Sequence, residues 1–377
     1  MSGFGRRWGL ATASVVVLVT ASACGSAGGG AGGTAAPASG TAKKDIKIAY
    51  ANYADNSPLF APITTAVKTS AAAAGMNAKV YDNKGTAETT LQNAQLMVQD
   101  KPDVVIEYSP DSAIGKSLFT VFDRAGSKCI ALNVPVEGCP WLNVINKNLG
   151  TAAGQMASDY ANKNGWTGAN TTVLLANSAR GGVEVNDTVR YTYLTVADKV
   201  PGFTKITPEQ FTESTTRIAA NAIVVDGGNT LDSSFAAVQA ALQNIPNDQN
   251  IIYSSVNDDT ASGGWRAIAE AGREKTSVVI GEGGSETALK QLRDNPQWIG
   301  EVDALVSVWG YYAVAMADAL AAGVKPPALT ELPFVALTKD TINDYYTDDL
   351  TSPKALPKPV DSNKYLFGRG ILESYRK

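Results

Sequence analysis

Histidine is absent from all 377 residues of the sequence. Without it the chain cannot form a Ser-His-Asp or Cys-His catalytic group, a His-ligated zinc site or the usual proton shuttle near neutral pH. Basic blocks are missing too, and the formal net charge is −4. A mildly acidic chain of this kind is a poor candidate for nucleic-acid binding. These absences exclude most exported hydrolases and most nucleic-acid-binding proteins.

Long apolar runs are also scarce, and the one that is present lies near the N-terminus. Two arginines precede an apolar stretch over residues 10–20, and small residues lead from it to Cys24, as in a secretory signal peptide. The junction Ala21-Ser22-Ala23-Cys24 resembles a bacterial lipobox, whose cysteine receives diacylglycerol and becomes the new N-terminus. We expect residues 1–23 to be a lipoprotein signal peptide and Cys24 to be lipidated. An ordinary cleaved signal with an incidental cysteine is the alternative, and the export route, general or twin-arginine, stays open.

The next segment, residues 24–44, is rich in Gly, Ala, Ser, Thr and Pro. Such a chain has little to bury and behaves as a flexible tether. No second apolar run is long enough to span a bilayer. We therefore expect the folded part to be held by a lipid anchor at the outer face of the cytoplasmic membrane, at the cell surface or in the periplasm.

Only three cysteines occur in the chain, and two of them lie beyond the tether. Cys129 and Cys139 are ten positions apart, across a loop that contains Pro135 and Gly138. Outside the cytoplasm, two cysteines at this spacing predict one disulfide that closes a short loop. Two buried thiols are the alternative.

From residue 45 onward, short apolar runs alternate with amphipathic stretches. Val104-Val105-Ile106 is apolar throughout, as expected for a strand that is buried on both faces. The alternation begins again in the second half of the chain, and predicts an α/β fold with two doubly wound parallel-sheet lobes. We expect strands at 46–50, 79–81, 104–106, 129–132, 172–175, 251–253, 278–280, 304–308 and 333–337.

Two further expectations concern boundaries. Ser57 and Pro58 have the character of a helix N-cap and first helical position. After Thr338 the chain becomes polar and contains several prolines. We expect that last segment to pack loosely on the surface.

Polar and aromatic residues follow several of the expected strands. Ligands bind outside the carboxyl ends of the strands in open parallel sheets. A single such residue is more typical of a turn or a cap, but many at one edge of two lobes indicate a ligand site. The residues concerned are Tyr53, Ser57, Tyr108, Asn133, Asn257, Asp258, Asp259 and Glu282, with Arg190 expected at the start of the helix that follows Gly181-Gly182.

At this point the sequence resembles a family, the type I periplasmic substrate-binding proteins of ABC transporters, in particular the ribose-binding-protein-like sugar binders. The resemblance covers most of residues 45–337. Its motifs are Asn56-Ser57-Pro58-Leu59-Phe60, Pro110-Asp111-Ser112, Asn257-Asp258-Asp259-Thr260-Ala261-Ser262-Gly263, Gly281-Glu282-Gly283 and Trp309-Gly310. The resemblance implies two lobes that are joined by three hinge strands and close on a ligand. It implies a first lobe of 45–147 plus 304–335 and a second of 148–303 plus 336–377.

The same resemblance implies which side chains bind the ligand. Arg190, Asn257 and Glu282 match a ligand-binding Arg, Asn and Asp, and Asn133 stands where many members have an Asp. A polar residue near the hinge is expected at Asp303 or beside it. The wall of the first lobe is expected at Tyr53, Ser57, Phe60 and Tyr108. Paired sugar hydroxyls suit planar carboxylate, amide and guanidinium groups, and aromatic rings suit the C–H faces of a pyranose.

We therefore expect a monomeric solute receptor that delivers a small polyhydroxylated ligand, most simply a monosaccharide or related polyol, to an ABC permease. We expect no cofactor, no metal, no nucleic acid and no catalytic step. A nucleoside or signal-molecule receptor of the same fold is the alternative. A third hypothesis, from another class, is an exported glycan-active enzyme that uses Asp258, Asp259 or Glu282 as acid and base.

Overall fold

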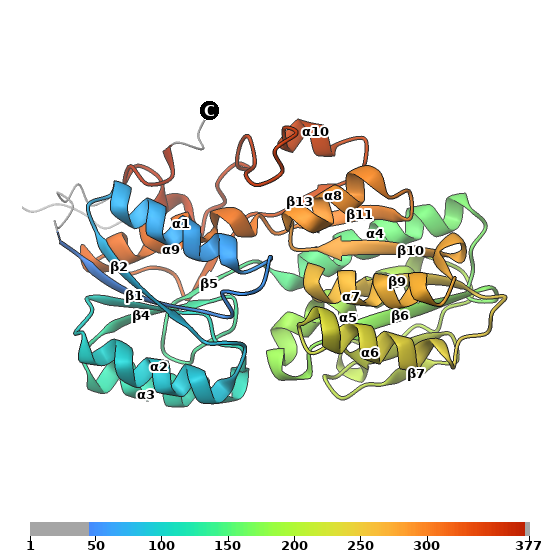
Figure 1. The fold of residues 1–377 in the computed structure, drawn as a ribbon, viewed down its shortest axis with the longest axis horizontal. Coiled ribbons are helices and arrows are strands. Elements are labelled where there is room, and N and C mark those ends of the chain that lie inside the picture. The colour runs from blue at the N-terminus through green and yellow to red at the C-terminus, as the bar shows by residue number, and fades with distance from the viewer. Residues whose placement is uncertain (1–44, 374–377) are drawn as a thin grey trace, which may run out of the picture. The chain divides into compact units, whose positions relative to one another are not determined.

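Continuous apolar segments form the central strands of two separate sheets. The computed structural model describes residues 45–373, in which each sheet is the centre of one α/β lobe (Figure 1). All four residues of β3 (Val104–Glu107) are buried, because helices cover both faces of its sheet. The prediction of two parallel-sheet lobes is confirmed.

The first lobe contains a six-stranded sheet in the order β12-β5-β4-β3-β1-β2. All its neighbouring strands are parallel. Helices α1 and α9 pack together on one side, and α2 and α3 pack together on the other. The elements are β1 (Lys47–Asn52), α1 (Ala61–Ala73), β2 (Asn77–Asp82), α2 (Ala87–Gln99), β3, η1 (Ser112–Ile114), α3 (Gly115–Arg124), β4 (Lys128–Leu132), β5 (Trp141–Asn143), α9 (Val306–Ala321) and β12 (Leu329–Glu331).

The second lobe contains a seven-stranded sheet in the order β13-β11-β10-β9-β6-β8-β7. Its two edge strands are antiparallel to their neighbours, and the others are parallel. Helices α4 and α5 form one pair, and α6 and α7 form another. The elements are α4 (Asn146–Lys163), β6 (Thr171–Asn177), η2 (Ala179–Gly181), α5 (Gly182–Lys199), η3 (Pro208–Gln210), β7 (Arg217–Ala219), β8 (Ala222–Asp226), α6 (Leu231–Leu242), β9 (Asn250–Ser255), α7 (Asp258–Glu270), η4 (Glu274–Thr276), β10 (Ser277–Glu282), α8 (Glu286–Asp294), β11 (Trp298–Asp303), β13 (Val335–Leu337) and α10 (Ile342–Tyr345).

The chain passes between the two sheets three times, after β5, after β11 and after β12. The second passage differs from the sequence expectation, because residues 304–308 are not a strand. The strand is β11, and α9 begins at Val306, next to Leu305 with its left-handed backbone (φ 55°). A helix that is buried on nearly all sides has the same unbroken apolar sequence as a buried strand. The second crossing segment, residues 304–305, is therefore a loop and not a strand.

The expected start of the first helix also requires correction. Ser57 caps a turn and not the helix itself, since α1 begins at Ala61. The Ser57 hydroxyl accepts bonds from the backbone N–H groups of Leu59 and Phe60.

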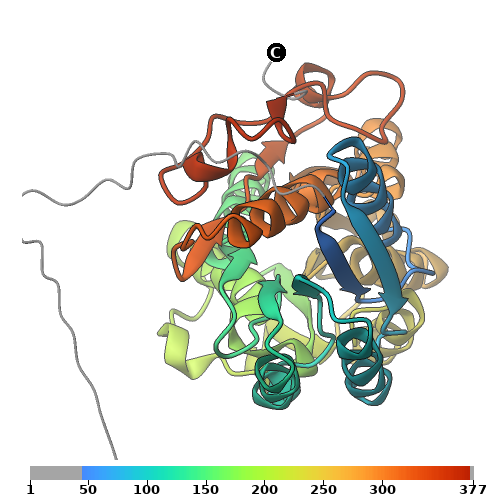
Figure 2. The same ribbon diagram turned by 90° about the vertical axis from the view of Figure 1, so that its left-hand side faces the viewer.

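The segment after Thr338 is more closely packed than expected. Tyr346, Leu366 and Leu372 are buried in it. Its last part, including η5 (Lys364–Leu366), lies against α9 in the first lobe (Figure 2), where Arg369 pairs with Asp318. We propose lobe limits that follow the sequence expectation with three exceptions: α4 from Asn146 and β13 from Val335 belong with the second lobe, and residues 363–373 belong with the first.

Two further observations bear on the sequence hypotheses. Cys129 and Cys139 are joined by a disulfide, with Cα atoms 5.2 Å apart. Within residues 45–373, no helix has the length and apolar character needed to cross a membrane. The signal, the tether and Cys24 lie outside the described residues.

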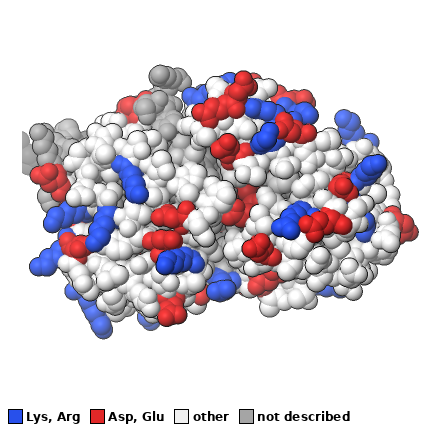
Figure 3. Space-filling view, in the orientation of Figure 1, with Lys and Arg blue, Asp and Glu red and all other residues white. Residues whose placement is uncertain are grey.

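Lysine, arginine and acidic side chains are interspersed on the face seen in Figure 3.

Candidate functional site

A cavity, here called the inner chamber, lies between the two lobes at the carboxyl ends of the strands. Its volume, measured as room for the centre of a water-sized sphere, is about 40 Å³. The position is the one at which open parallel sheets bind ligands. The chamber is lined by Leu59, Phe60, Tyr108, Asn133, Val144, Asn146, Leu149, Val185, Asn229, Val256, Asn257, Glu282, Gly283, Ala304, Val306 and Trp309.

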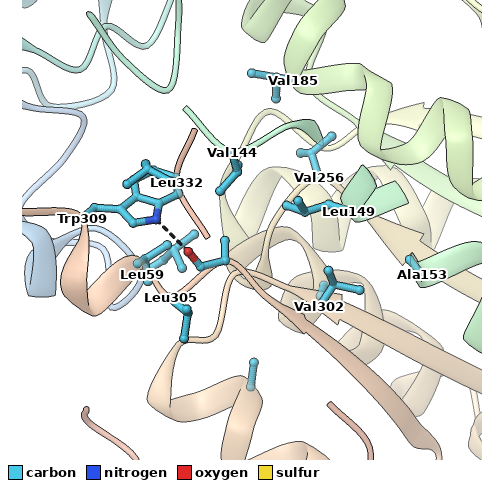
Figure 4. Packing of buried hydrophobic residues seen from close by; sticks show 14 of the residues in the cluster. Leu59, Val144, Leu149, Ala153, Val185, Val256, Val302, Leu305, Trp309 and Leu332 are labelled. Atoms are coloured by element: carbon cyan, nitrogen blue, oxygen red, sulfur yellow. Dashed lines mark hydrogen bonds between the residues drawn. The ribbon is translucent and has the colours of Figure 1, made fainter. Parts of the chain in front are cut away.

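Aliphatic and aromatic side chains form most of the chamber wall. Figure 4 shows Leu59 and Trp309 of the first lobe facing Leu149, Val185 and Val256 of the second. The Trp309 indole N–H donates to the Ala304 carbonyl oxygen at 2.7 Å, which fixes the ring beside the second crossing segment. The wall is therefore mainly apolar and is held in place.

Four aromatic rings form a continuous series along the first lobe. Tyr53 stacks on Phe60 with ring centroids 4.5 Å apart, and Phe60 meets Tyr108 edge-on at 5.4 Å. Tyr108 lies 6.2 Å from Trp309. These distances and angles are typical of favourable aromatic contacts, and the contacts hold the rings of the wall in place.

The amides of the chamber are held by neighbouring groups. Asn257 caps α7 by accepting from the Thr260 N–H at 2.9 Å, and its own amide donates to the Asn229 side chain at 3.2 Å. Asn133 has a left-handed backbone (φ 60°), and its amide donates to Asn143 at 3.2 Å. The Asn257 oxygen also accepts from the Thr260 hydroxyl, whereas one N–H of each amide and the Asn133 side-chain oxygen bond no described residue and remain for a ligand.

Glu282 and Asn146 differ from these amides, because each has a buried polar atom without a partner among the described residues. The atoms without a partner at hydrogen-bond distance are Glu282 Oε2 and Asn146 Nδ2. The Asn146 side chain is nevertheless close enough to the Glu184 carboxyl to oppose the rise of the Glu184 pKa that burial causes. The Thr188 hydroxyl joins the two side chains, at 2.9 Å from Glu282 Oε1 and 3.3 Å from Asn146 Oδ1. Thr188 is positioned by close packing, since a side chain at Gly150 of α4 would overlap the Thr188 carbonyl of α5. Asn146 and Glu282, which both line the chamber, thus each have one buried polar atom that no described residue satisfies.

Burial raises the pKa of the Glu282 carboxyl well above its usual range. The hydrogen bond from Thr188 opposes this shift, and the nearby Asp258 charge adds to it. A neutral carboxyl also suits the geometry: Glu282 then donates to Thr188, whose own proton is free for Asn146. A hydroxyl has only one proton, so an ionised Glu282 leaves one of those two contacts unbonded.

A second, larger space, here called the outer pocket, adjoins the inner chamber and shares Phe60 and Asn229 with it. Its volume on the same measure is about 460 Å³. The Ser57 hydroxyl of the first lobe donates to Asp259 of the second at 2.6 Å and bridges the lobes there. The other lining residues are Tyr53, Ala54, Asn56, Pro58, Lys84, Gly85, Pro110, Ser178, Arg180, Asp226, Gly228, Thr230, Leu231, Asp232 and Ser233.

Most of the sequence-predicted site residues line one of these two spaces. Phe60, Tyr108, Asn133, Asn257 and Glu282 line the inner chamber, and Tyr53 and Ser57 line the outer pocket with Phe60.

Arg190 and Asp303 line neither space. Arg190 lies in the middle of α5, not at its start, and pairs with Asp187 while its Nε donates to the Phe211 carbonyl. Asp303 accepts from the Leu305 N–H and the Tyr346 hydroxyl at the second crossing segment. Burial raises the Asp303 pKa to about 7, although both hydrogen bonds oppose the shift. Both residues support the fold around the site in this structure.

Three polar or aromatic residues that line the chamber were not predicted from the sequence as site residues. Trp309 was noted only as part of a motif, and its aromatic character before Gly310 was the available signal. Asn146 and Asn229 carried no signal, because asparagine is common at helix starts and in turns. Asp258 is bound to the Ser285 N–H, and no group of three or more acidic or cysteine side chains in residues 45–373 is arranged to hold a metal.

Residues 48–325 match the family described as periplasmic binding protein domain, and the chain belongs to this family. The resemblance stated above is confirmed, and so is the extracytoplasmic location that it implies. A protein of this family binds a solute without a catalytic step, so the hypothesis of a glycan-active enzyme is not supported. No curated protein matches the chain in sequence.

Solved structures similar to this chain include solute-binding proteins of ABC transporters. One from Actinobacillus succinogenes, with bound D-allose, has 16% identity and a TM-score of 0.66, and the match covers 80% of this chain and 100% of the other. One from Mycobacterium smegmatis, with bound glycerol, has 20% identity and a TM-score of 0.68 over 80% and 97%. One from Bacillus halodurans, with bound myo-inositol, has 12% identity and a TM-score of 0.65 over 80% and 97%.

Proposed function

We propose that this protein is the receptor of an ABC importer and that it binds a small, neutral, polyhydroxylated ligand of the sugar or polyol class between its lobes. The observation that carries the proposal is the pair of unpartnered atoms, Glu282 Oε2 and Asn146 Nδ2, in a chamber whose other walls are mainly apolar and aromatic and include three further asparagines. Such a lining binds a neutral molecule that has both hydroxyl groups and C–H faces. The sugars and polyols in proteins of the same fold support this class.

The test is a thermal-shift screen of mature protein against monosaccharides, polyols and nucleosides, followed by calorimetric titration of each hit. We expect a sugar or polyol to bind and to raise the melting temperature. A nucleoside that binds while every sugar and polyol fails would contradict the proposed ligand class.

We also propose that the mature protein is a lipid-anchored monomer that carries the Cys129–Cys139 disulfide and is expected to contact the permease from outside the cell membrane. The supporting observations are the Ala-Ser-Ala-Cys junction and the geometry of the two cysteines. Cys24→Ser is expected to release the protein from membranes in detergent partitioning and to leave ligand binding unchanged. Two reactive thiols in unreduced, denatured mature protein would refute the disulfide.

A further inference from the structure

The inner chamber is too small for a whole sugar ring in the closed arrangement seen here. A water molecule needs about 10–15 Å³ on the measure used above, so the chamber has room for about three waters. A pyranose with its hydroxyl groups displaces more water than this. The outer pocket, at about 460 Å³, is large enough, and it has Phe60 and Asn229 as lining residues in common with the chamber. A ligand held between the lobes therefore has most of its bulk in the outer pocket.

The two spaces also differ in chemistry. In the inner chamber the two unpartnered buried atoms are Asn146 Nδ2 and Glu282 Oε2, and both belong to side chains that contact Thr188. They can bind one polar atom of a ligand, and the surrounding aliphatic wall favours carbon around it. The chamber thus suits a small end group with a single hydroxyl or carbonyl.

The outer pocket offers many more polar groups. Lys84 from the first lobe and Arg180 from the second have side chains without a hydrogen bond or ion pair to any residue in the range 45–373. Asn56, Asp226 and Asp232 add exposed amide and carboxylate groups. The Tyr53 and Phe60 rings stack at the junction of the two spaces. This mixture of amide, carboxylate, cation and ring suits a hydroxyl-rich sugar.

We propose that the ligand is a glycoside that occupies both spaces, with its sugar unit in the outer pocket and a small, weakly polar group, linked through the anomeric oxygen, in the inner chamber. Asn146 and Glu282 bind the one polar atom of that group. This inference rests on the proposed function and names the substrate class more closely.

Calorimetric titration against matched probes tests the inference. The probes are D-glucose and D-galactose, the methyl and 2-hydroxyethyl glycosides of each in both anomeric forms, and glycerol. We expect at least one 2-hydroxyethyl glycoside to bind about tenfold or more tightly than its free sugar, because a desolvated hydrogen bond and a buried carbon group are gained. The methyl glycoside, which lacks the terminal hydroxyl, is expected to bind with intermediate affinity.

Two variants separate the two spaces. Asn56→Trp places a bulky ring in the outer pocket at an exposed position, and is expected to weaken the tightest glycoside about tenfold or more. Lys68→Trp, on the exposed side of α1 and remote from both linings, is its control and should bind like wild type. Glu282→Ala is expected to abolish the preference for 2-hydroxyethyl over methyl. Circular dichroism and thermal unfolding establish that each variant is folded.

The outcomes distinguish the two proposals. If a free monosaccharide binds as tightly as its glycosides, and Asn56→Trp leaves its affinity unchanged, the glycoside inference is wrong while the sugar receptor stands. If no carbohydrate or polyol of this panel or of the wider screen binds, the proposed function itself is wrong.

Discussion

Replacing Glu282 by glutamine tests whether the carboxyl at the inner chamber is neutral in the folded protein. The amide has nearly the same shape, stays neutral at every pH and can donate to Thr188 as the protonated carboxyl does. Any difference between the two proteins that depends on pH therefore reports the proton on Glu282. The comparison requires no knowledge of the ligand.

The sign of the effect follows from the raised pKa of the folded state. Glutamate has a pKa of about 4.3 in an unfolded chain, so above that pH the unfolded protein has released a proton that the folded protein retains. The stabilising contribution of Glu282 is complete below the unfolded pKa and is lost as pH rises toward the folded pKa. The loss is about 1.4 kcal/mol per pH unit for one group. As pH rises from 5, wild type is expected to lose unfolding free energy relative to Glu282→Gln until the pH reaches the raised pKa of the folded state.

Urea denaturation at pH 5, 6 and 7 measures this difference directly. Acidic residues that do not interact with Glu282 titrate alike in both proteins, so their contributions cancel. Glu286→Gln, at an exposed position in the first turn of α8, is the matched control and should run parallel to wild type. If Glu282→Gln also runs parallel to wild type, Glu282 is ionised and the reasoning from burial fails.

Three further substitutions give distinct expected results. Ser57→Ala removes the bond to Asp259 that joins the lobes, so ligand affinity measured by calorimetry should fall roughly fivefold; unchanged affinity would show that the bond is not needed for closure. Arg190→Ala leaves buried partners unpaired and should lower the unfolding free energy by about 3–5 kcal/mol, with little change in affinity of the folded protein; a stable variant that fails to bind would instead make Arg190 a ligand contact. Tyr346→Phe should cost about 1–3 kcal/mol in the same denaturation assay, because Asp303 loses a donor, and an unaltered midpoint would contradict that role.

The fold could be predicted from the sequence where burial on both faces makes a strand apolar throughout. That reasoning located β3 and most other central strands. It failed at β11, whose Glu301 and Asp303 are buried acids, and at the start of α9, which is apolar on nearly all sides. Glu301 accepts from the Trp298 indole N–H at 3.0 Å and from the Gly284 N–H at 3.1 Å. Hydrogen-bond partners from other parts of the chain offset the cost of burying such acids. A local sequence pattern does not show these partners.

The site was predictable to a similar degree and for a similar reason. Residues directly after a strand, such as Asn133 and Asn257, share one edge of a sheet whatever the details of packing. Arg190 is different, because its role depends on Asp187 one helical turn away and on Phe211 in a later loop. Asn146 could not be predicted as a site residue, because its distinguishing feature is an unsatisfied amide nitrogen, which only the folded structure shows.

The unsatisfied Asn146 amide is relevant to how the two lobes close on a ligand. Asn146 and Glu282 belong to the second lobe, whereas Phe60 and Trp309 reach the chamber from the first. A ligand contacts both sets only when the lobes are together, so its affinity is greater for the closed arrangement than for an open one. A ligand shifts a conformational equilibrium only by such a difference in affinity. A bond to Asn146 or Glu282 can form in the open arrangement as well, because both side chains lie in the second lobe. The difference in affinity therefore comes from contacts that form only on closure, with Phe60 and Trp309 of the first lobe. The second-lobe atoms without partners bind the ligand, and the first-lobe rings make closure depend on it.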